Sequence, residues 1–254
     1  MSSEMSFHDL VDLAGRQRVF RARQKLNLPG YISHITQRAS GREPLFVEDG
    51  DYLTMLGLMK EVAHTFDIQV YALCLMGNHI HLLLEPQQGN LSQAMHSLFS
   101  RYAMRFNRKY SRRGHVFGGA FRQAICLDPS YLLTASLYIH LNPVRAGLVE
   151  EAPRYRWSSC SLYCSDQDRN SFVNPDPVLI LVDEDRAKAR KHYALLIHKG
   201  FEAQPDNALE QETAIERFLT RLAAMFPWLF KRAADKDQPQ SPSEHQVLDL
   251  PVLE

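Results

Sequence analysis

The chain has 254 residues, 45% of them apolar and 23% charged, which suffices for one or two globular domains with a substantial core. Its 29 basic and 29 acidic side chains cancel, so the net charge by itself excludes no class of partner. Residues 1–165 contain 18 Lys and Arg against 13 Asp and Glu, whereas residues 166–254 contain 11 against 16. The basic part is therefore the candidate nucleic-acid-binding part.

The cysteine content and the hydropathy of the chain predict the cellular compartment in which the protein works. The four cysteines are widely spaced and form no paired C-x-x-C knuckles, so we expect neither a disulfide framework nor a zinc module. No run approaches 18 consecutive apolar residues, and the first residues, MSSEMSFHDLVDLAG, lack the order of a signal peptide. These features predict a cytoplasmic protein without membrane contact.

Residues 1–29 are expected to form a basic arm that ends at the Pro29-Gly30 pair. Five cations lie within ten positions of this arm, and the first three of them are Arg16, Arg18 and Arg21. Such a cluster is a candidate contact for the phosphates of a nucleic acid.

Six elements follow in the order strand, helix, strand, strand, helix, strand. Alternating β-formers predict the strands, and apolar residues three and four apart predict the helices. Gly77-Asn78 is expected to form the tight turn between the second and third strands. The order is that of an α+β, ferredoxin-like β-α-β-β-α-β sheet with both helices on one face, which leaves the other face free for a ligand. The predicted ranges are 31–36, 51–66, 68–75, 79–85, 91–110 and 121–127.

A third helix is expected after the sheet, with Asp128 as N-cap, Pro129 in its first turn and an end at Asn142 before Pro143. Trp157 is a candidate core anchor in the loop-rich segment that follows. A linker, a C-terminal helical extension and a disordered tail are predicted at 166–185, 186–232 and 233–254. The predicted domains are an arm, a catalytic domain and an extension at 1–29, 30–165 and 166–254.

His79 and His81 are two residues apart in the strand predicted over 79–85. Successive strand side chains point to opposite faces, so both imidazoles share one face while Ile80 and Leu82 face the helix-covered core. Two imidazoles on an open sheet face can bind one divalent ion. An H-x-H pair alone is more often two ordinary surface residues, so the motif needs support from elsewhere.

Tyr138 and Asn142 are four residues apart in the third predicted helix and share one of its faces. The amide can complete a metal site, and the phenol beside it is a candidate nucleophile if a base or cation favours its phenolate. Packing with an exposed hydroxyl is the alternative for such a tyrosine. His140 falls on roughly the opposite side of the helix and is expected to be structural or to contact DNA.

Seven cations between residues 101 and 122 form a third feature. A surface of this kind attracts a phosphate backbone, and the aromatic residues between the cations could stack on bases. A solvated helix face with core aromatics is the alternative. The candidate contacts are Arg101, Arg105, Arg108, Lys109, Arg112, Arg113 and Arg122, and Arg145 after the third helix is another candidate phosphate partner.

Taken together, these segments resemble the single-tyrosine HUH transposases, and most closely the REP-associated tyrosine transposases of bacteria. The resemblance spans about residues 15–163. Several ordered motifs across one domain are far more specific than H-x-H alone. They are G-N-H-I-H-L-L-L at 77–84, F-N-R at 106–108, R-x-G-H-V-F-x-G-x-F-R at 112–122, Y-L-L at 131–133, Y-I-H-L-N-P-V-R-A-G-L-V at 138–149 and W-S-S at 157–159.

The resemblance implies a metal-dependent endonuclease and strand transferase that cleaves and rejoins single-stranded, hairpin-forming DNA through a 5′-phosphotyrosine. It assigns His79 and His81 to the HUH metal pair, Tyr138 to the nucleophile and Asn142 to the third metal ligand. The implied metal is Mg²⁺ or Mn²⁺, and the implied location is the cytoplasm, in association with the nucleoid. The family contains monomers as well as homodimers in which one chain's tyrosine serves its partner's metal site.

Two other functions remain open at this point. A non-catalytic single-stranded nucleic-acid binder could use the same sheet face, and Tyr138→Phe would then behave like the parent. A metal phosphodiesterase with a water nucleophile would turn over without a covalent adduct. The intact histidine pair together with the tyrosine favours the transposase.

Overall fold

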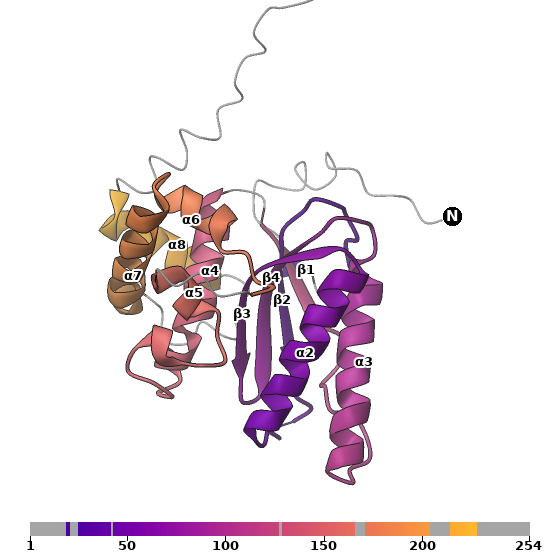
Figure 1. The fold of residues 1–254 in the computed structure, drawn as a ribbon. Helices are drawn as coiled ribbons and strands as arrows, with labels where there is room; N and C mark the ends of the chain where they lie inside the picture. Colours follow the sequence, from indigo (N-terminus) through magenta and orange to yellow (C-terminus); the bar gives the residue numbers. More distant parts are fainter. Residues whose placement is uncertain are drawn as a thin grey trace, which may run out of the picture.

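A five-stranded antiparallel sheet lies between two groups of helices (Figure 1). The computed structural model describes residues 19–20, 25–41, 43–126, 129–165, 171–203 and 214–227. The strand order in the sheet is β1-β5-β2-β4-β3. The strands are β1 (Val19–Phe20), β2 (Ser33–Arg38), β3 (Ile68–Met76), β4 (His79–Pro86) and β5 (Arg122–Ile125).

The chain order β2-α2-β3-β4-α3-β5 confirms the predicted ferredoxin-like α+β arrangement, with α2 (Asp49–Thr65) and α3 (Leu91–Lys109) on one face. The ends of these six elements differ from the predicted ones by no more than two residues. The short strand β1 was not predicted, and it pairs with β5 at the edge of the sheet. The predicted arm cations Arg16, Arg18 and Arg21 lie outside the described residues.

The two faces of the sheet have different environments. On β4, Ile80 and Leu82 pack in the core under α2 and α3, whereas Leu83 packs in a second core on the opposite side. His79 and His81 have the same parity as Leu83, so the predicted alternation along this strand is confirmed.

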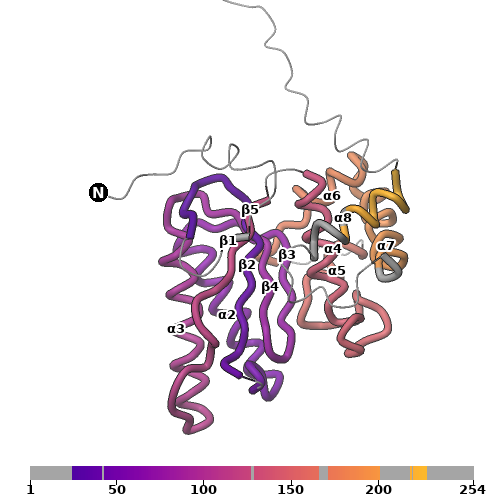
Figure 2. The backbone as a smooth tube through the Cα atoms, turned by 180° about the vertical axis from the view of Figure 1, so that it is seen from behind, coloured from indigo at the N-terminus to yellow at the C-terminus, as the bar shows by residue number. Residues whose placement is uncertain are grey.

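The expectation of a free second face is wrong over β3 and β4. Both views place α4 (Pro129–Arg145) beside β3, and further helices pack behind it (Figure 2). All residues of α4 from 131 to 143 are buried, and a helix that is apolar all round must be covered on every side. The helices behind it are η1 (Ala152–Arg154), α5 (Cys160–Cys164), α6 (Asp176–Val182), α7 (Arg186–Ala203) and α8 (Ala214–Met225).

Two further predictions are corrected in this region. Helix α4 continues through Pro143 to Arg145, although a proline at this position removes one backbone hydrogen bond of the helix. The predicted linker 166–185 contains α6, whose Val178, Leu179 and Val182 are buried in the same core as α4. The apolar residues of α6 are flanked by acidic and turn-forming residues, and these neighbours favour a linker when the sequence is considered alone. The predicted tail 233–254 lies outside the described residues.

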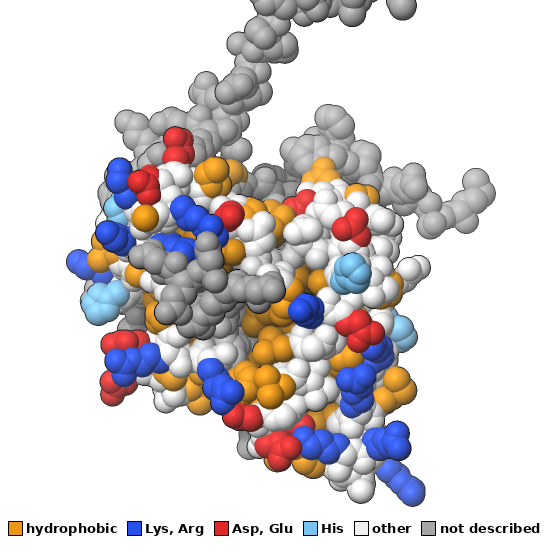
Figure 3. Space-filling view, in the orientation of Figure 1, with side chains coloured by type: hydrophobic (Ala, Val, Ile, Leu, Met, Phe, Trp, Pro, Cys, Tyr) orange, Lys and Arg blue, Asp and Glu red, His pale blue; other side chains and the backbone are white. Residues whose placement is uncertain are grey.

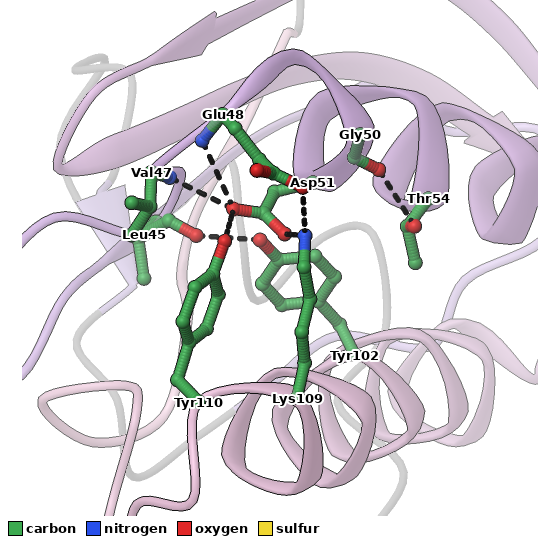
Figure 4. A network of polar contacts seen from close by, with 9 residues as sticks. All are labelled: Leu45, Val47, Glu48, Gly50, Asp51, Thr54, Tyr102, Lys109 and Tyr110. Carbon is green, nitrogen blue, oxygen red and sulfur yellow. Dashed lines mark hydrogen bonds and ion pairs between the residues drawn. The ribbon is translucent and has the colours of Figure 1, made fainter.

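A buried carboxylate joins the start of α2 to the end of α3 (Figure 4). Asp51 is 3% exposed and accepts hydrogen bonds from the backbone amides of Val47 (2.8 Å) and Glu48 (3.2 Å). The Tyr110 hydroxyl (2.7 Å) and the Lys109 ammonium (2.5 Å) also donate to it. The carboxylate therefore fixes the two helices to each other on the face opposite α4.

Candidate active site

The two histidines of the H-x-H motif lie at the start of β4, directly after the Gly77-Asn78 turn. His79 pairs across the sheet with Arg38, and His81 pairs with Thr36. Both side chains face α4 and are buried, with 5% and 2% of their surface exposed. The two rings are perpendicular, with centroids 4.9 Å apart, so the structure brings the predicted pair together in a protected place.

In each of these imidazoles one ring nitrogen has a hydrogen-bond partner, and the other has none among the described residues. His79 Nδ1 lies 2.7 Å from Asn78 Oδ1, and His81 Nδ1 lies 3.0 Å from His34 Nε2. Both Nε2 atoms are buried without a hydrogen-bond partner among the described residues. A buried polar atom without a partner costs about 1–3 kcal/mol, which calls for an explanation. Two Nε2 atoms with engaged Nδ1 atoms are typical of metal-ligating histidines.

The surroundings keep these rings neutral. Burial, assisted by the charge of Arg38, lowers the pKa of His79 to about 4, and burial lowers the pKa of His81 well below its usual value. A neutral imidazole is the form that binds a metal ion, so near neutral pH a metal ion does not have to displace a second proton from either ring.

Tyr138 extends from α4 toward the same place. Its ring centroid is 5.8 Å from that of His81 and 6.2 Å from that of His34, and only 3% of the residue is exposed. Burial raises the pKa of Tyr138 to about 12, and the charges of Arg145 and Arg38 oppose that rise. The phenol is therefore protonated at neutral pH and needs help to become a nucleophile.

Asn142 lies one turn after Tyr138, and its side chain is anchored at one end. Its Nδ2 donates to the Tyr138 carbonyl oxygen at 2.8 Å, while its Oδ1 is buried without a partner among the described residues. The described chain contains no cluster of three or more His, Cys, Asp or Glu side chains suited to a metal ion. The buried atoms without a partner near Tyr138 thus include two imidazole nitrogens and one amide oxygen, which are donor types that divalent ions accept.

Three residues of β2 complete this face and were missed in the sequence. His34, Thr36 and Arg38 alternate along the strand and lie beside β4. The Thr36 hydroxyl is 3.3 Å from His81 Nδ1. The sequence contained the information needed to find them. A ferredoxin-like order places the first strand, which carries these three residues, beside the third strand, which carries the H-x-H motif.

The predicted DNA-contacting cations separate into two groups. Arg122 lies on β5 opposite Thr36, so it shares the face of the histidines, and it is exposed. Arg101, Arg105 and Arg108 lie on α3, on the other side of the sheet from α4, where Figure 3 shows Lys and Arg side chains toward the end of α3. The cations on α3 therefore lie on a different face of the molecule from the candidate site.

Acidic neighbours engage part of this second group. Arg101 forms an ion pair with Glu61 at 2.7 Å, and Lys109 pairs with Asp51 and Glu48. The structure also pairs Arg112 with Glu43, whereas Arg113 is exposed in the loop between α3 and β5. Tyr102 and Phe106 are buried in the core, in agreement with the alternative that the aromatics of this run pack inside.

His140 lies away from the candidate site, and its expected structural role is confirmed. Its Nδ1 is 2.8 Å from the Tyr193 hydroxyl on α7, and its Nε2 is 2.8 Å from Ser159 Oγ. The residue is fully buried, and burial lowers its pKa to about 3. It holds α4 to its neighbours as a neutral group.

Comparison with protein families now adds to this geometry. Residues 28–142 match the family described as "Transposase IS200 like". This segment is similar to the IS200-like transposases. The matched segment contains both histidines, Tyr138 and Asn142, and it ends within α4. The candidate site therefore lies inside the segment that is similar to transposases, which are proteins that act on DNA.

A solved structure of a REP-associated tyrosine transposase bound to a REP hairpin also matches the chain. The match has a TM-score of 0.49 and 13% sequence identity, and it covers 59% of this chain and 94% of that one. A comparison with curated proteins found no match. Within the described residues, none of the helices has the length and apolar character needed to cross a membrane.

Proposed function

We propose that this protein is an IS200-like transposase that cleaves and rejoins single-stranded, hairpin-forming DNA, with Tyr138 as the nucleophile and a divalent metal ion at His79, His81 and Asn142. The observation that carries the proposal is the meeting of two buried, unpartnered imidazole nitrogens with a tyrosine ring 5.8 Å from His81. Such costly unpaired atoms are expected where histidines bind a metal ion, and the phenol beside them is where a nucleophile would stand.

In the proposed reaction the Tyr138 oxygen attacks the scissile phosphorus. A tyrosine–phosphate bond forms, the bond from phosphorus to the 3′-oxygen breaks, and the phenol proton is lost while the leaving 3′-oxygen gains one. The phosphodiester is exchanged and not hydrolysed, so the resulting 5′-phosphotyrosine can be attacked by a second 3′-hydroxyl without ATP.

The residues around Tyr138 support this role. A bound Mg²⁺ or Mn²⁺ ion would polarise the phosphate and stabilise the charge that develops in the transition state. Arg38 and Arg145 favour the phenolate, since their charges act against the rise that burial causes in the pKa of Tyr138. Arg122, which is exposed on the same face, is positioned to contact the phosphates that flank the cleavage point.

We further propose that the tyrosine serves the histidines of its own chain. Tyr138 contacts His81 and His34 of the same chain, and α4 is buried against the sheet and against α6, α7 and α8. Exchange of α4 with a second copy would have to rebuild this same core around the partner's helix. A homodimer is therefore not needed to complete the site.

The test is covalent adduct formation on a labelled single-stranded hairpin oligonucleotide with Mn²⁺ or Mg²⁺, followed on a denaturing gel. We expect a protein–DNA adduct that is lost in Tyr138→Phe and in His79→Ala. Tyr163→Phe is the matched control, because this buried tyrosine donates to the Tyr71 carbonyl at 2.6 Å, away from the histidine pair. DNA cleavage that survives in Tyr138→Phe would identify water as the nucleophile, and binding without cleavage would identify a binding module; either result refutes the proposal.

A further inference from the structure

A third histidine touches the proposed metal pair without belonging to it. His34 on β2 is 6% exposed, and its Nε2 lies 3.0 Å from His81 Nδ1. The two ring centroids are 5.2 Å apart with the planes tilted by 30°. The nitrogen that His34 turns toward the site is thus already engaged with His81.

This contact decides where His81 carries its proton. A neutral imidazole has one N–H and one lone pair, and the atom that binds a metal must be the one with the lone pair. The free atom of His81 is Nε2, so its proton must be on Nδ1 in the metal-binding form. The nearest group to that proton is His34 Nε2 at 3.0 Å, which then has to act as an acceptor. If His34 donated instead, His81 would carry its proton on Nε2 and would be blocked.

His79 shows the same requirement met by a simpler partner. Its Nδ1 lies 2.7 Å from Asn78 Oδ1, and an amide oxygen can only accept. His34, the partner of His81, can either donate or accept a hydrogen bond, and so can the Thr36 hydroxyl at 3.3 Å. The tautomer of His81 therefore depends on a side chain outside the metal set.

We propose that His34 is a positioning residue that accepts the Nδ1 proton of His81 and so holds His81 Nε2 ready for a divalent ion. The inference rests on the proposed metal site at His79 and His81. Outer partners of metal-ligating histidines commonly change metal affinity about 10- to 100-fold, because they fix both tautomer and ring orientation.

The first test measures Mn²⁺ binding to the full chain by titration calorimetry without DNA. His34→Leu removes the acceptor, and we expect its Mn²⁺ affinity to fall about 10-fold or more. His34→Gln places an amide oxygen near the former Nε2 position, and we expect its affinity to lie within about 3-fold of the wild type. Mn²⁺ binding that His34→Leu retains, or that His34→Gln loses to the same extent as His34→Leu, overturns the proposal.

A second measurement and one control separate the inference from the metal site on which it rests. In the metal-free wild type, the ¹⁵N shifts of the imidazole nitrogens should show His81 protonated on Nδ1, and protonation on Nε2 overturns the inference even if His34→Leu fails to fold. Binding lost in His79→Ala but kept in His34→Leu refutes only the role of His34. Absence of Mn²⁺ binding in the wild type refutes the metal site as well.

Discussion

The Tyr193 hydroxyl on α7 connects the C-terminal helices to α4, the helix that carries Tyr138. The substitution Tyr193→Phe tests how much this connection stabilises the protein. The Tyr193 hydroxyl lies 2.8 Å from His140 Nδ1 and donates to Ser136 Oγ at 3.0 Å, and both partners are on α4. All three residues are fully buried. Tyr193→Phe keeps the ring and removes only these contacts.

The expected magnitude follows from what remains after the substitution. Ser136 Oγ still donates to the Leu133 carbonyl at 2.7 Å, but the fully buried His140 Nδ1 loses its partner. A buried polar group left without a partner costs about 1–3 kcal/mol, so we expect Tyr193→Phe to lower the free energy of unfolding by that amount. Tyr163→Phe, which removes one hydrogen bond to a backbone carbonyl, should cost about 1 kcal/mol.

Urea denaturation at pH 7, followed by circular dichroism, measures both values under one condition. The double variant Tyr193→Phe with His140→Leu should recover part of the loss, because both polar partners are then replaced by apolar groups. A Tyr193→Phe protein within about 0.3 kcal/mol of the wild type would refute the reasoning, since coupling across this contact would then be negligible.

Three further predictions concern the other face, a loop and the DNA path. Burial alone would raise the pKa of Asp51, but its hydrogen bonds outweigh burial and the net pKa is lowered. The contribution of Asp51 to stability is therefore present above pH ~4 and is lost as the pH falls through its lowered pKa. In urea titrations Asp51→Asn should cost about 1–3 kcal/mol at pH 7 and less at pH 3. Gly118→Ala should lower the melting temperature, because the new Cβ would lie 2.9 Å from the Ala39 carbonyl oxygen, and an unchanged value would contradict this packing. In binding titrations with single-stranded DNA, Arg122→Ala should weaken affinity more than Arg101→Ala, because Arg101 already forms an ion pair with Glu61 on the other face of the sheet. The reverse order would place the DNA along α3.

The sequence was sufficient for the elements with strong periodicity. The alternation in β4 placed His79 and His81 on one face, and the apolar stripe of α3 predicted its bounds within one residue. Local spacing also separated His140 from Tyr138, and the structure confirms a structural role for His140.

Other features depend on contacts between distant segments, which local patterns do not encode. The acceptor role of His34 requires the register of β2 against β4, and the burial of Tyr138 requires the C-terminal helices that cover α4. Likewise, the engagement of Lys109 by Asp51 joins residues 58 positions apart, so a cation predicted to bind DNA is held in an ion pair. Charge patterns along the chain predict a basic surface but not which of its members are already paired.

The most direct test of the central claim is to identify the residue that becomes attached to DNA. The full chain is incubated with Mn²⁺ and a single-stranded hairpin oligonucleotide, the DNA is trimmed with a nuclease, and the peptides are examined by mass spectrometry. We predict a nucleotide joined through a 5′-phosphate to the peptide that contains Tyr138, on the Tyr138 oxygen. Cleaved DNA without any modified peptide, or a nucleotide on a residue other than Tyr138, would contradict the account.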